Sequence, residues 1–457
     1  MTTNLLILGA SGDLTNRLLL PGIGSLLEYE PGRDLRILGA DRVDLGRDGF
    51  ADRLAQALTR GGAPTDVAAE QRDRSDYFQV DVTDAAALGS AIQRVGDCDR
   101  LVLYFALPPA ITEKACRALL SSHLPAHTHL AMEKPFGHDL PSARALNEVV
   151  ARLVPESQTH RIDHFLGKST VVDVIALRFA NRLLQAAWSA DQIEAIEIVY
   201  EEALALEGRA GYYDHAGALV DMIQSHLLQV LSIVAMEQPS RLDSRELRDA
   251  KTAVLRATRL WRDDAVTATR RARYTAGRIG DKDVPNYVDE PGVDAALDTE
   301  TLAEITVEVS NQRWAGVPIT LRSGKALGAT RKQIVLTFAD VRHLPRGLRG
   351  FDPKDRMVIG LDPGVMELHL TTNTADDPLA LEQSVLTTEL RKADLDAYGE
   401  VLAAILDGET MLSVRGDAAE ECWRITDEVL DAWRAGKVPM EEYPAGSSGP
   451  ESWRSRD

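Results

Sequence analysis

The stretch NLLILGASGDL, residues 4–14, decides the fold class of this protein. Its apolar run predicts a buried strand over Asn4–Leu8, and apolar residues three and four apart predict a helix over Leu14–Glu28. Gly9 permits the tight turn between them, and Gly12 lets the backbone approach a pyrophosphate at the helix N-terminus. This is a shortened form of the GxGxxG pattern, and taken alone it also fits a plain strand-to-helix turn.

Strands and helices continue to alternate after this turn. Further strands are predicted at Leu35–Ala40, Tyr77–Val80, Arg100–Ala106 and Thr128–Met132, and helices at Asp48–Arg60, Ala85–Val95 and Thr112–Ser121. This alternation implies parallel strands joined by right-handed crossovers. We therefore expect an α/β domain at residues 1–165, a doubly wound Rossmann domain that binds a dinucleotide.

The rest of the chain has a different rhythm, with strands that lack regular intervening helices. Helices are predicted at Ser169–Ala187 and Ala218–Ala235, and strands at Ala195–Tyr200, Thr301–Val309, Pro318–Arg322, Gln333–Phe338 and Val365–Leu370. We expect an α+β domain at residues 166–450, with a large antiparallel sheet and helices on one face. The Gly- and Ser-rich end, Ala445–Asp457, is expected to be frayed, with residues 451–457 as a tail outside the domain.

The composition limits the partners of the protein. Its 457 residues exceed what one core serves, and the formal charge of −19 argues against nucleic acid. An anionic substrate would need a local cluster of cations. Three cysteines without CxxC spacing favour a reducing compartment such as the cytoplasm, and we expect no metal centre. No signal peptide is recognisable, and no stretch approaches the roughly 20 apolar residues that a membrane helix needs.

Three further strand ends carry candidate cofactor residues. Asp41 would accept a hydrogen bond from a ribose 2′-hydroxyl, as in NAD sites, whereas Arg42 would pair with the 2′-phosphate of NADP. The sequence favours NADP and leaves NAD open. Leu107 and Pro108 follow the fourth strand and Lys134 the fifth, where open α/β sheets place ligands. The predicted cofactor set is completed by Gly9, Ser11, Gly12, Asp13 and Leu14.

Together these segments resemble one family. The matching segments are GASGDL at 9–14, ALPP at 106–109, EKPFG at 133–137, RIDHFLGK at 161–168, EGRAGYYDHAGALVDMIQSHLLQ at 207–229, NYVDEPG at 286–292, RWAGVPITLRSGKAL at 313–327 and YPAGSSGP at 443–450. In this order and spacing the chain is similar to the glucose-6-phosphate dehydrogenase family along nearly its whole length. Several long matches in order are far more specific than any one motif.

The resemblance implies a Rossmann domain joined to a large β+α domain, usually paired into a homodimer, with a homotetramer also open. It implies hydride transfer from C1 of a hexose 6-phosphate to a nicotinamide, the reaction that opens the pentose phosphate and Entner–Doudoroff routes. His226 matches the family's base, and histidine suits that role because its pKa lies near neutrality. Asp163 matches the carboxylate that orients the base. A lone helical histidine would otherwise be a structural side chain.

The resemblance also assigns the substrate residues. His164 and Lys168 lie four apart at the entry to a helical run, which puts them on one face, and the family uses these positions to hold the phosphate. Arg331 offers a further cation. The positions that match family residues holding sugar hydroxyls are Lys134, Glu202, Asp221 and Lys325.

The chain departs from the family around the anion. Leu18 replaces a lysine, Phe165 a tyrosine and Thr330 a basic residue. Each lost charge-assisted hydrogen bond costs about 1.5–3 kcal/mol. Smaller departures fall at Ser169, Ser225 and Ser448.

These departures leave two dehydrogenase hypotheses. One is an ordinary family member in which Lys168 and Arg331 hold the phosphate. The other is a paralogue for another C6-substituted or unphosphorylated hexose, with NAD as its alternative cofactor. A third hypothesis, a non-catalytic dinucleotide-binding regulator, is disfavoured because binding alone needs no base such as His226.

Overall fold

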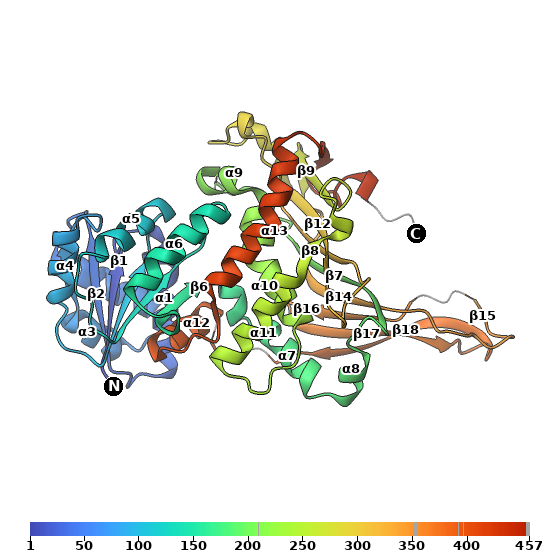
Figure 1. The fold of residues 1–457 in the computed structure, drawn as a ribbon, viewed down its shortest axis with the longest axis horizontal. Coiled ribbons are helices and arrows are strands. Elements are labelled where there is room, and N and C mark those ends of the chain that lie inside the picture. Colours follow the sequence, from blue (N-terminus) through green and yellow to red (C-terminus); the bar gives the residue numbers. More distant parts are fainter. Residues whose placement is uncertain (209, 351–353, 392, 396, 454–457) are drawn as a thin grey trace. The chain divides into compact units, whose positions relative to one another are not determined.

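The computed structural model describes residues 1–208, 210–350, 354–391, 393–395 and 397–453, which form two compact units (Figure 1). Unit 1 comprises Met1–Lys168, Pro239–Thr252 and Ala393–Glu421. Unit 2 comprises Ser169–Gln238, Ala253–Lys392 and Cys422–Asp457. The first segment of unit 1 ends close to the boundary expected after residue 165. Its two later segments carry no local sequence signal that assigns them to this unit.

Unit 1 is built on a seven-stranded sheet in the order β19-β6-β5-β4-β1-β2-β3. The strands are β1 (Thr3–Leu8), β2 (Leu35–Asp41), β3 (Asp76–Gln79), β4 (Arg100–Phe105), β5 (Thr128–Met132), β6 (Thr159–Ile162) and β19 (Ser413–Val414). β1–β6 pair in parallel, and β19 runs antiparallel to β6. The order 3-2-1-4-5-6 is that of a Rossmann sheet, which confirms the predicted doubly wound fold.

Helices cover both faces of this sheet (Figure 1). They are η1 (Thr15–Leu19), α1 (Leu20–Tyr29), α2 (Gly46–Arg60), α3 (Thr65–Arg74), α4 (Ala85–Gln93), α5 (Pro109–Leu119), α6 (Leu140–Leu153), η2 (Glu156–Gln158), η3 (His164–Gly167) and α12 (Ala397–Asp407). The predicted helix over 14–28 forms as a π-helical turn, η1, followed by α1.

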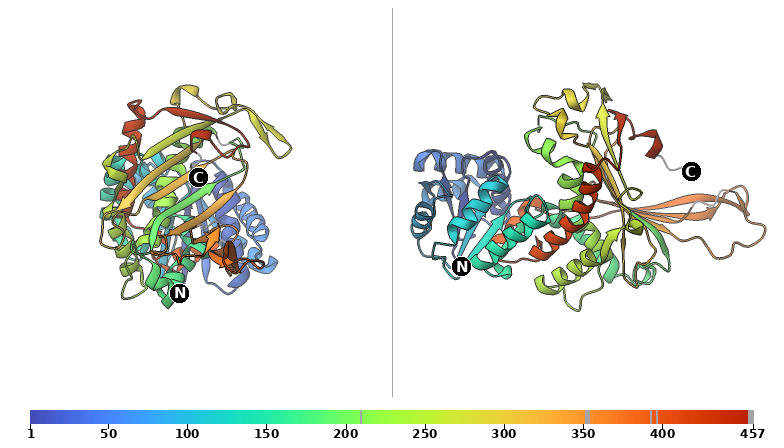
Figure 2. Two further views of the ribbon diagram at one scale, coloured as in Figure 1. Left: turned by 90° about the vertical axis from the view of Figure 1, so that its right-hand side faces the viewer. Right: turned by 45° about the horizontal axis from the view of Figure 1, so that its top comes forward.

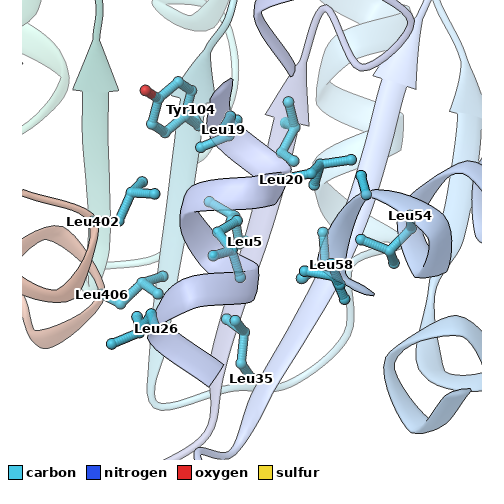
Figure 3. Packing of buried hydrophobic residues seen from close by; sticks show 14 of the residues in the cluster. Leu5, Leu19, Leu20, Leu26, Leu35, Leu54, Leu58, Tyr104, Leu402 and Leu406 are labelled. Carbon is cyan, nitrogen blue, oxygen red and sulfur yellow. The ribbon is translucent and has the colours of Figure 1, made fainter. Parts of the chain in front are cut away.

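Helix α12 reaches the core of unit 1 from late in the sequence. Leu402 and Leu406, four residues apart on one face, pack with Leu5 of β1 and Leu26 of α1 (Figure 3). All four side chains are buried, and each contributes about 1.5–3 kcal/mol by leaving water. α12 therefore completes the hydrophobic layer that holds α1 on the sheet.

Unit 2 contains an eleven-stranded sheet in the order β15-β18-β17-β16-β14-β7-β13-β12-β9-β20, with β8 also paired to β12. The strands are β7 (Ile193–Glu201), β8 (Thr258–Leu260), β9 (Thr269–Thr275), β12 (Leu302–Val309), β13 (Ile319–Gly324), β14 (Arg331–Phe338), β15 (Arg349–Gly350), β16 (Arg356–Gly360), β17 (Val365–Asn373), β18 (Ala380–Glu389) and β20 (Met440–Pro444). A small hairpin is formed by β10 (Gly277–Ile279) and β11 (Lys282–Val284). β17 and β18 make a long hairpin that projects from the sheet (Figure 2).

The expectation of an antiparallel sheet holds for most neighbours and is wrong for three. The pairs β7/β13, β9/β20 and β15/β18 are parallel. The partners in each pair are far apart in the chain, so long connections can return the strand in the same direction. Strand patterns reveal alternation but not which strands become neighbours.

The helices of unit 2 include α7 (Ser169–Phe179), α8 (Arg182–Ala187), α9 (Ala210–Ala218), η4 (Leu219–Leu227) and α10 (Leu228–Ala235). α11 (Ser244–Ala257) and α13 (Gly416–Arg434) begin in segments of unit 1 and end in segments of unit 2. Short 3-10 turns lie at η5 (Trp261–Asp263), η6 (Tyr287–Asp289), η7 (Ala295–Leu297) and η8 (Glu451–Trp453).

One helical stretch bears on the expectation that no segment crosses a membrane. Ala210–Ala235 is long enough and, with a mean hydropathy of 1.5, apolar enough to cross a membrane. However, 78% of its most apolar window is buried inside the structure. Burial of this kind is typical of a core helix, and this stretch carries apolar residues of the core of unit 2.

The expectation of a frayed end from Ala445 is wrong as far as Trp453. The backbone N–H of Ala445 donates to Thr275 O at 3.0 Å, and that of Gly446 donates to Ala326 O at 2.8 Å. Trp453 is 7% exposed, and its indole N–H donates to Glu441 at 2.7 Å. These hydrogen bonds and the burial of Trp453 outweigh the Gly- and Ser-rich composition. Residues 454–457, the rest of the predicted tail, lie outside the described residues.

Candidate active site

A cavity of about 380 Å³ lies at the C-terminal ends of β1, β2 and β4 in unit 1. It brings together seven of the predicted cofactor residues: Gly9, Ser11, Gly12, Asp41, Arg42, Leu107 and Pro108. Its lining also includes residues without a predicted role, namely Val43, Val80–Thr83, Ala106, Ile111 and Lys114. The loop after β3 and the first turns of α5 thus add to the walls. Their part could have been anticipated only from the position of strand ends in this fold.

The glycine turn has the shape that its sequence predicts. Gly9 has a φ of +92°, and a Cβ there would lie 2.3 Å from Ala106 O, so only glycine fits. The N–H of Gly12 and the hydroxyl of Thr15 both donate to Gly9 O at 3.0 Å. These bonds hold the loop open at the start of the helix, where N–H groups favour an anion. The cavity therefore fits the phosphate-bearing part of a dinucleotide.

Asp41 is turned toward the glycine loop. Its Oδ2 accepts from the N–H of Ser11 at 3.1 Å and from the Ser11 hydroxyl at 2.7 Å, and its Oδ1 accepts from the N–H of Arg42 at 2.7 Å. The exposed Arg42 guanidinium makes no ion pair within the described part of the chain. The hydrogen bond from Thr83 is the main cause that lowers the pKa of Asp81, and Arg42 adds a smaller contribution.

Three predicted cofactor residues do not line this cavity. Asp13 forms an exposed ion pair with Arg17 at 3.3 Å, and Leu14 packs against the hydrophobic core. Lys134 follows the end of β5, beside Glu133. The part of these three residues in cofactor binding stays a prediction.

The predicted phosphate residues follow β6, where the helical expectation is wrong. His164–Gly167 is a 3-10 turn, Lys168 is extended, and the α-helix begins only at Ser169. The cause is local: Asp163, 2% exposed, caps the turn by accepting the N–H of Phe165 at 2.9 Å. Lys168 Nζ lies 4.5 Å from the centre of the Phe165 ring, and the His164 ring lies 5.1 Å from it. The His164 and Lys168 side chains therefore flank one buried phenyl ring.

In unit 2, two of the predicted sugar residues form an ion pair. Lys325 Nζ lies 2.8 Å from Glu202 Oε2 and 5.1 Å from the centre of the Tyr213 ring. Tyr212, which is 42% exposed, forms a hydrogen bond with Asp221. The hydroxyl of Tyr213 is buried without a hydrogen-bond partner among the described residues. The two tyrosines lie inside a matched segment, but no pattern in the sequence gave them a role.

His226 lies on η4, a π-helical segment in which Asp221 also lies. π-helical turns are rare and often mark functional sites. His226 is 1% exposed, and the preceding Ser225 donates its hydroxyl to Val220 O at 2.9 Å. The pairing of His226 with Asp163, a residue of unit 1, stays a prediction.

The start of η4 is held by a buried carboxylate. Glu300 accepts the N–H of Leu219 at 2.9 Å, and a Cβ on Gly217 would lie 2.3 Å from the same carboxylate. Gly217 has a φ of +64°, so a residue with a side chain would be strained there as well. Burial raises the pKa of Glu300 to about 7.

Arg331 is not brought to the Lys325–Glu202 pair. Its Nε lies 2.6 Å from Glu201 Oε2, and Glu201 also accepts from Arg322 at 2.6 Å. Successive residues of a strand point to opposite faces of the sheet, so Glu201 and Glu202 face opposite ways. Arg331, Glu201 and Arg322 line a cavity of about 570 Å³ in unit 2. The assignment of Arg331 to the substrate phosphate therefore stays a prediction.

Two family models match the chain. The model "Glucose-6-phosphate dehydrogenase, NAD binding domain" matches residues 6–173, and the model "Glucose-6-phosphate dehydrogenase, C-terminal domain" matches residues 175–455. With the Rossmann sheet and its glycine-loop cavity, this defines the protein as a nicotinamide-dependent oxidoreductase. Curated relatives include the glucose-6-phosphate 1-dehydrogenase of Gluconobacter oxydans, which is 39% identical and aligns over 97% of this chain and 94% of its own length. The glucose-6-phosphate 1-dehydrogenase of Treponema pallidum is 36% identical and aligns over 98% of this chain and 92% of its own length.

Solved structures agree. The glucose-6-phosphate 1-dehydrogenase of Mycobacterium avium is 33% identical, with a TM-score of 0.86 over 99% of this chain and 95% of that one. A glucose-6-phosphate dehydrogenase in complex with its substrate glucose-6-phosphate is 29% identical, with a TM-score of 0.85 over 98% and 96%. The chain belongs to the glucose-6-phosphate dehydrogenase family.

Proposed function

We propose that this enzyme oxidises C1 of glucose 6-phosphate with NADP and forms 6-phosphogluconolactone. The observation that carries the proposal is the Lys325–Glu202 ion pair at 2.8 Å, in a unit that also holds the buried His226. Both positions of the pair match the family residues that hold sugar hydroxyls. A polyol requires such donors and acceptors because each of its hydroxyls must be paired when water is removed.

In the proposed reaction His226 takes the proton of the C1 hydroxyl while hydride leaves C1. The C1–H bond breaks, a C1=O bond forms, and the histidine becomes an imidazolium. Asp163 keeps His226 in the tautomer whose free ring nitrogen can accept the proton, and it stabilises the positive charge that forms on the imidazolium. The bound nicotinamide supplies the acceptor for the hydride. Glu202, Asp221, Lys325 and Lys134 orient the sugar so that C1 faces that acceptor.

NADP is the proposed cofactor because of the contacts around Arg42. Asp41, the residue that would favour NAD, is engaged by Ser11 through two hydrogen bonds, whereas the Arg42 guanidinium is exposed at the cavity edge. A 2′-phosphate suits that guanidinium. NAD remains the alternative cofactor. Each carboxylate oxygen of Asp41 has more than one lone pair, so Asp41 can still accept a hydrogen bond from a ribose 2′-hydroxyl.

His164 and Lys168 are the proposed phosphate ligands, and the ring between them favours a second candidate substrate. Phe165 brings no donor, and Leu18, which replaces a family lysine, is 53% exposed. These two residues would suit a hexose with a different group at C6. We further propose that the enzyme works in the cytoplasm, as a homodimer or homotetramer, in the pentose phosphate or Entner–Doudoroff route.

The test is reduction of NADP and of NAD, followed by absorbance, with glucose 6-phosphate, glucose and other C6-substituted hexoses. A large preference for glucose 6-phosphate over glucose supports the proposal and shows that His164 and Lys168 suffice. Equal or faster turnover of another hexose would replace it with the second candidate. Absence of turnover with every hexose would contradict both.

A further inference from the structure

Three residues of unit 1, Tyr104, Tyr398 and Glu133, bring their side-chain oxygens together in a triangle next to Lys134 in the sequence. The hydroxyls of Tyr104 and Tyr398 both donate to Glu133 Oε1, each at 2.5 Å. The two hydroxyl oxygens lie 2.7 Å apart. A single carboxylate oxygen thus accepts two phenolic donors from residues far apart in the sequence.

Each of the three residues is positioned by a different element of unit 1. Tyr104 is at the end of β4 and fully buried, and its ring belongs to the same core as Leu402 of α12 (Figure 3). Tyr398 is in the first turn of α12. A Cβ on Gly22 of α1 would lie 3.0 Å from the Tyr398 ring, so the ring packs closely against the backbone of α1 at this glycine. Glu133 directly follows β5, next to the strand that carries Tyr104.

The charges around Glu133 connect the triangle to the proposed site. Burial raises the pKa of Glu133, whereas the hydrogen bonds from Tyr104 and Tyr398 and the nearby charge of Lys134 lower it. The negative charge of Asp163 raises it. Glu133 therefore lies within electrostatic reach of the lysine assigned to cofactor and sugar and of the carboxylate assigned to the base.

We propose that Glu133, clamped by Tyr104 and Tyr398, is a positioning residue that fixes Lys134 for cofactor and substrate. This inference rests on the proposed function, in which Lys134 meets both ligands. The two tyrosines keep the carboxylate charged and in one rotamer, and its negative charge attracts the ammonium of the next residue. Without the two donors, burial would favour the neutral acid, and Lys134 would lose its anionic neighbour.

The test compares Tyr398→Phe, Tyr104→Phe and Glu133→Gln with the control Tyr274→Phe. Tyr274 in unit 2 also donates its hydroxyl to a glutamate, Glu290, at 3.0 Å, so the control removes the same kind of bond elsewhere. The measurements are kcat and KM against pH, the dissociation constant of NADPH against pH, and the urea midpoint of unfolding.

We expect both network tyrosine variants to lose about tenfold to a hundredfold in kcat/KM, the range of one charge-assisted hydrogen bond. As the pH is lowered, we expect NADPH binding of both variants to weaken at a higher pH than in the wild type. The reason is that Glu133, without one of its donors, has a higher pKa and is protonated first. Glu133→Gln should bind NADPH weakly, with this pH step removed. Tyr274→Phe should keep the wild-type profile even where its unfolding midpoint falls.

A network that only stabilises the fold would lower the unfolding midpoint and leave the pH dependence of NADPH binding where it is in the wild type and in Tyr274→Phe. That result would overturn the inference. NADPH binding needs no turnover, so the inference is judged even if the wild type oxidises no hexose. Absence of turnover would contradict the proposed function alone.

Discussion

Ser11 donates both its backbone N–H and its hydroxyl to one carboxylate oxygen of Asp41, at 3.1 and 2.7 Å. The residue that most favours NAD is thereby used to brace the glycine loop. Arg42, the next residue, is the one that we propose meets the 2′-phosphate of NADP.

Arg42→Gln should raise KM for NADP by about tenfold or more and change KM for NAD little, since it removes one ionic hydrogen bond to the 2′-phosphate. Initial rates with both cofactors check this. Arg117→Gln, which removes an exposed arginine of α5 paired with Glu113, is the control and should change neither value. An equal loss with NAD and NADP would assign Arg42 to a part that both cofactors share.

His226→Asn should lower kcat by about a hundredfold to ten-thousandfold, the usual contribution of a general base, while NADPH still binds. Steady-state kinetics measures the loss in kcat, and titration with NADPH measures cofactor binding separately. A variant that keeps wild-type turnover would show that another group takes the proton, and a wild type without turnover would bring back the regulator hypothesis.

Lys325→Ala should raise KM for the sugar and leave the cofactor constants unchanged, because Glu202 loses its partner at 2.8 Å. One such charged interaction is worth about 1.5–3 kcal/mol, or roughly tenfold to a hundredfold. Arg331→Ala is the matched comparison, since Arg331 pairs with the neighbouring Glu201 on the opposite face of the sheet. Equal effects of the two variants on the sugar would support the assignment of Arg331 to the substrate site, and an unchanged KM in Arg331→Ala would contradict it.

Glu300→Gln should make stability less dependent on pH. The folded pKa of Glu300 is raised to about 7 by burial, so its contribution to stability is present in acid and is lost as pH rises through 7. The glutamine still accepts the N–H of Leu219 and carries no charge. We expect a gain on the order of 1–3 kcal/mol at pH 8, and little change at pH 4.5, in urea unfolding. An unchanged slope of stability against pH would contradict this assignment.

Local sequence patterns correctly predicted the elements whose signal lies within one short stretch of sequence. The apolar strands of the Rossmann sheet and the glycine turn at Gly9 carry their own signals. The return of α12 to unit 1 depends on packing between Leu402 and residues near the N-terminus, which no local pattern contains. The face on which Arg331 lies follows from strand alternation only when its neighbour, β7, is known.

The candidate site shows the same limit. Motif matches located His226, Lys325 and Glu202, but not the tyrosines that surround or brace the site. Tyr104 and Tyr398 meet only through tertiary structure, so neither could be paired from sequence. The spacing of His164 and Lys168 predicted a helix face, and the Asp163 cap replaced that helix with a 3-10 turn.

The placement of α12 in unit 1 has a consequence for biosynthesis. Because Leu402 and Leu406 belong to the core formed by β1 and α1, the nucleotide-binding unit lacks part of its interior until the ribosome has made most of the polypeptide. During translation the emerging N-terminal sheet would expose apolar surface that chaperones can bind. A fragment ending at residue 168 would lack these core residues permanently, so we expect that it does not fold as an independent cofactor-binding module.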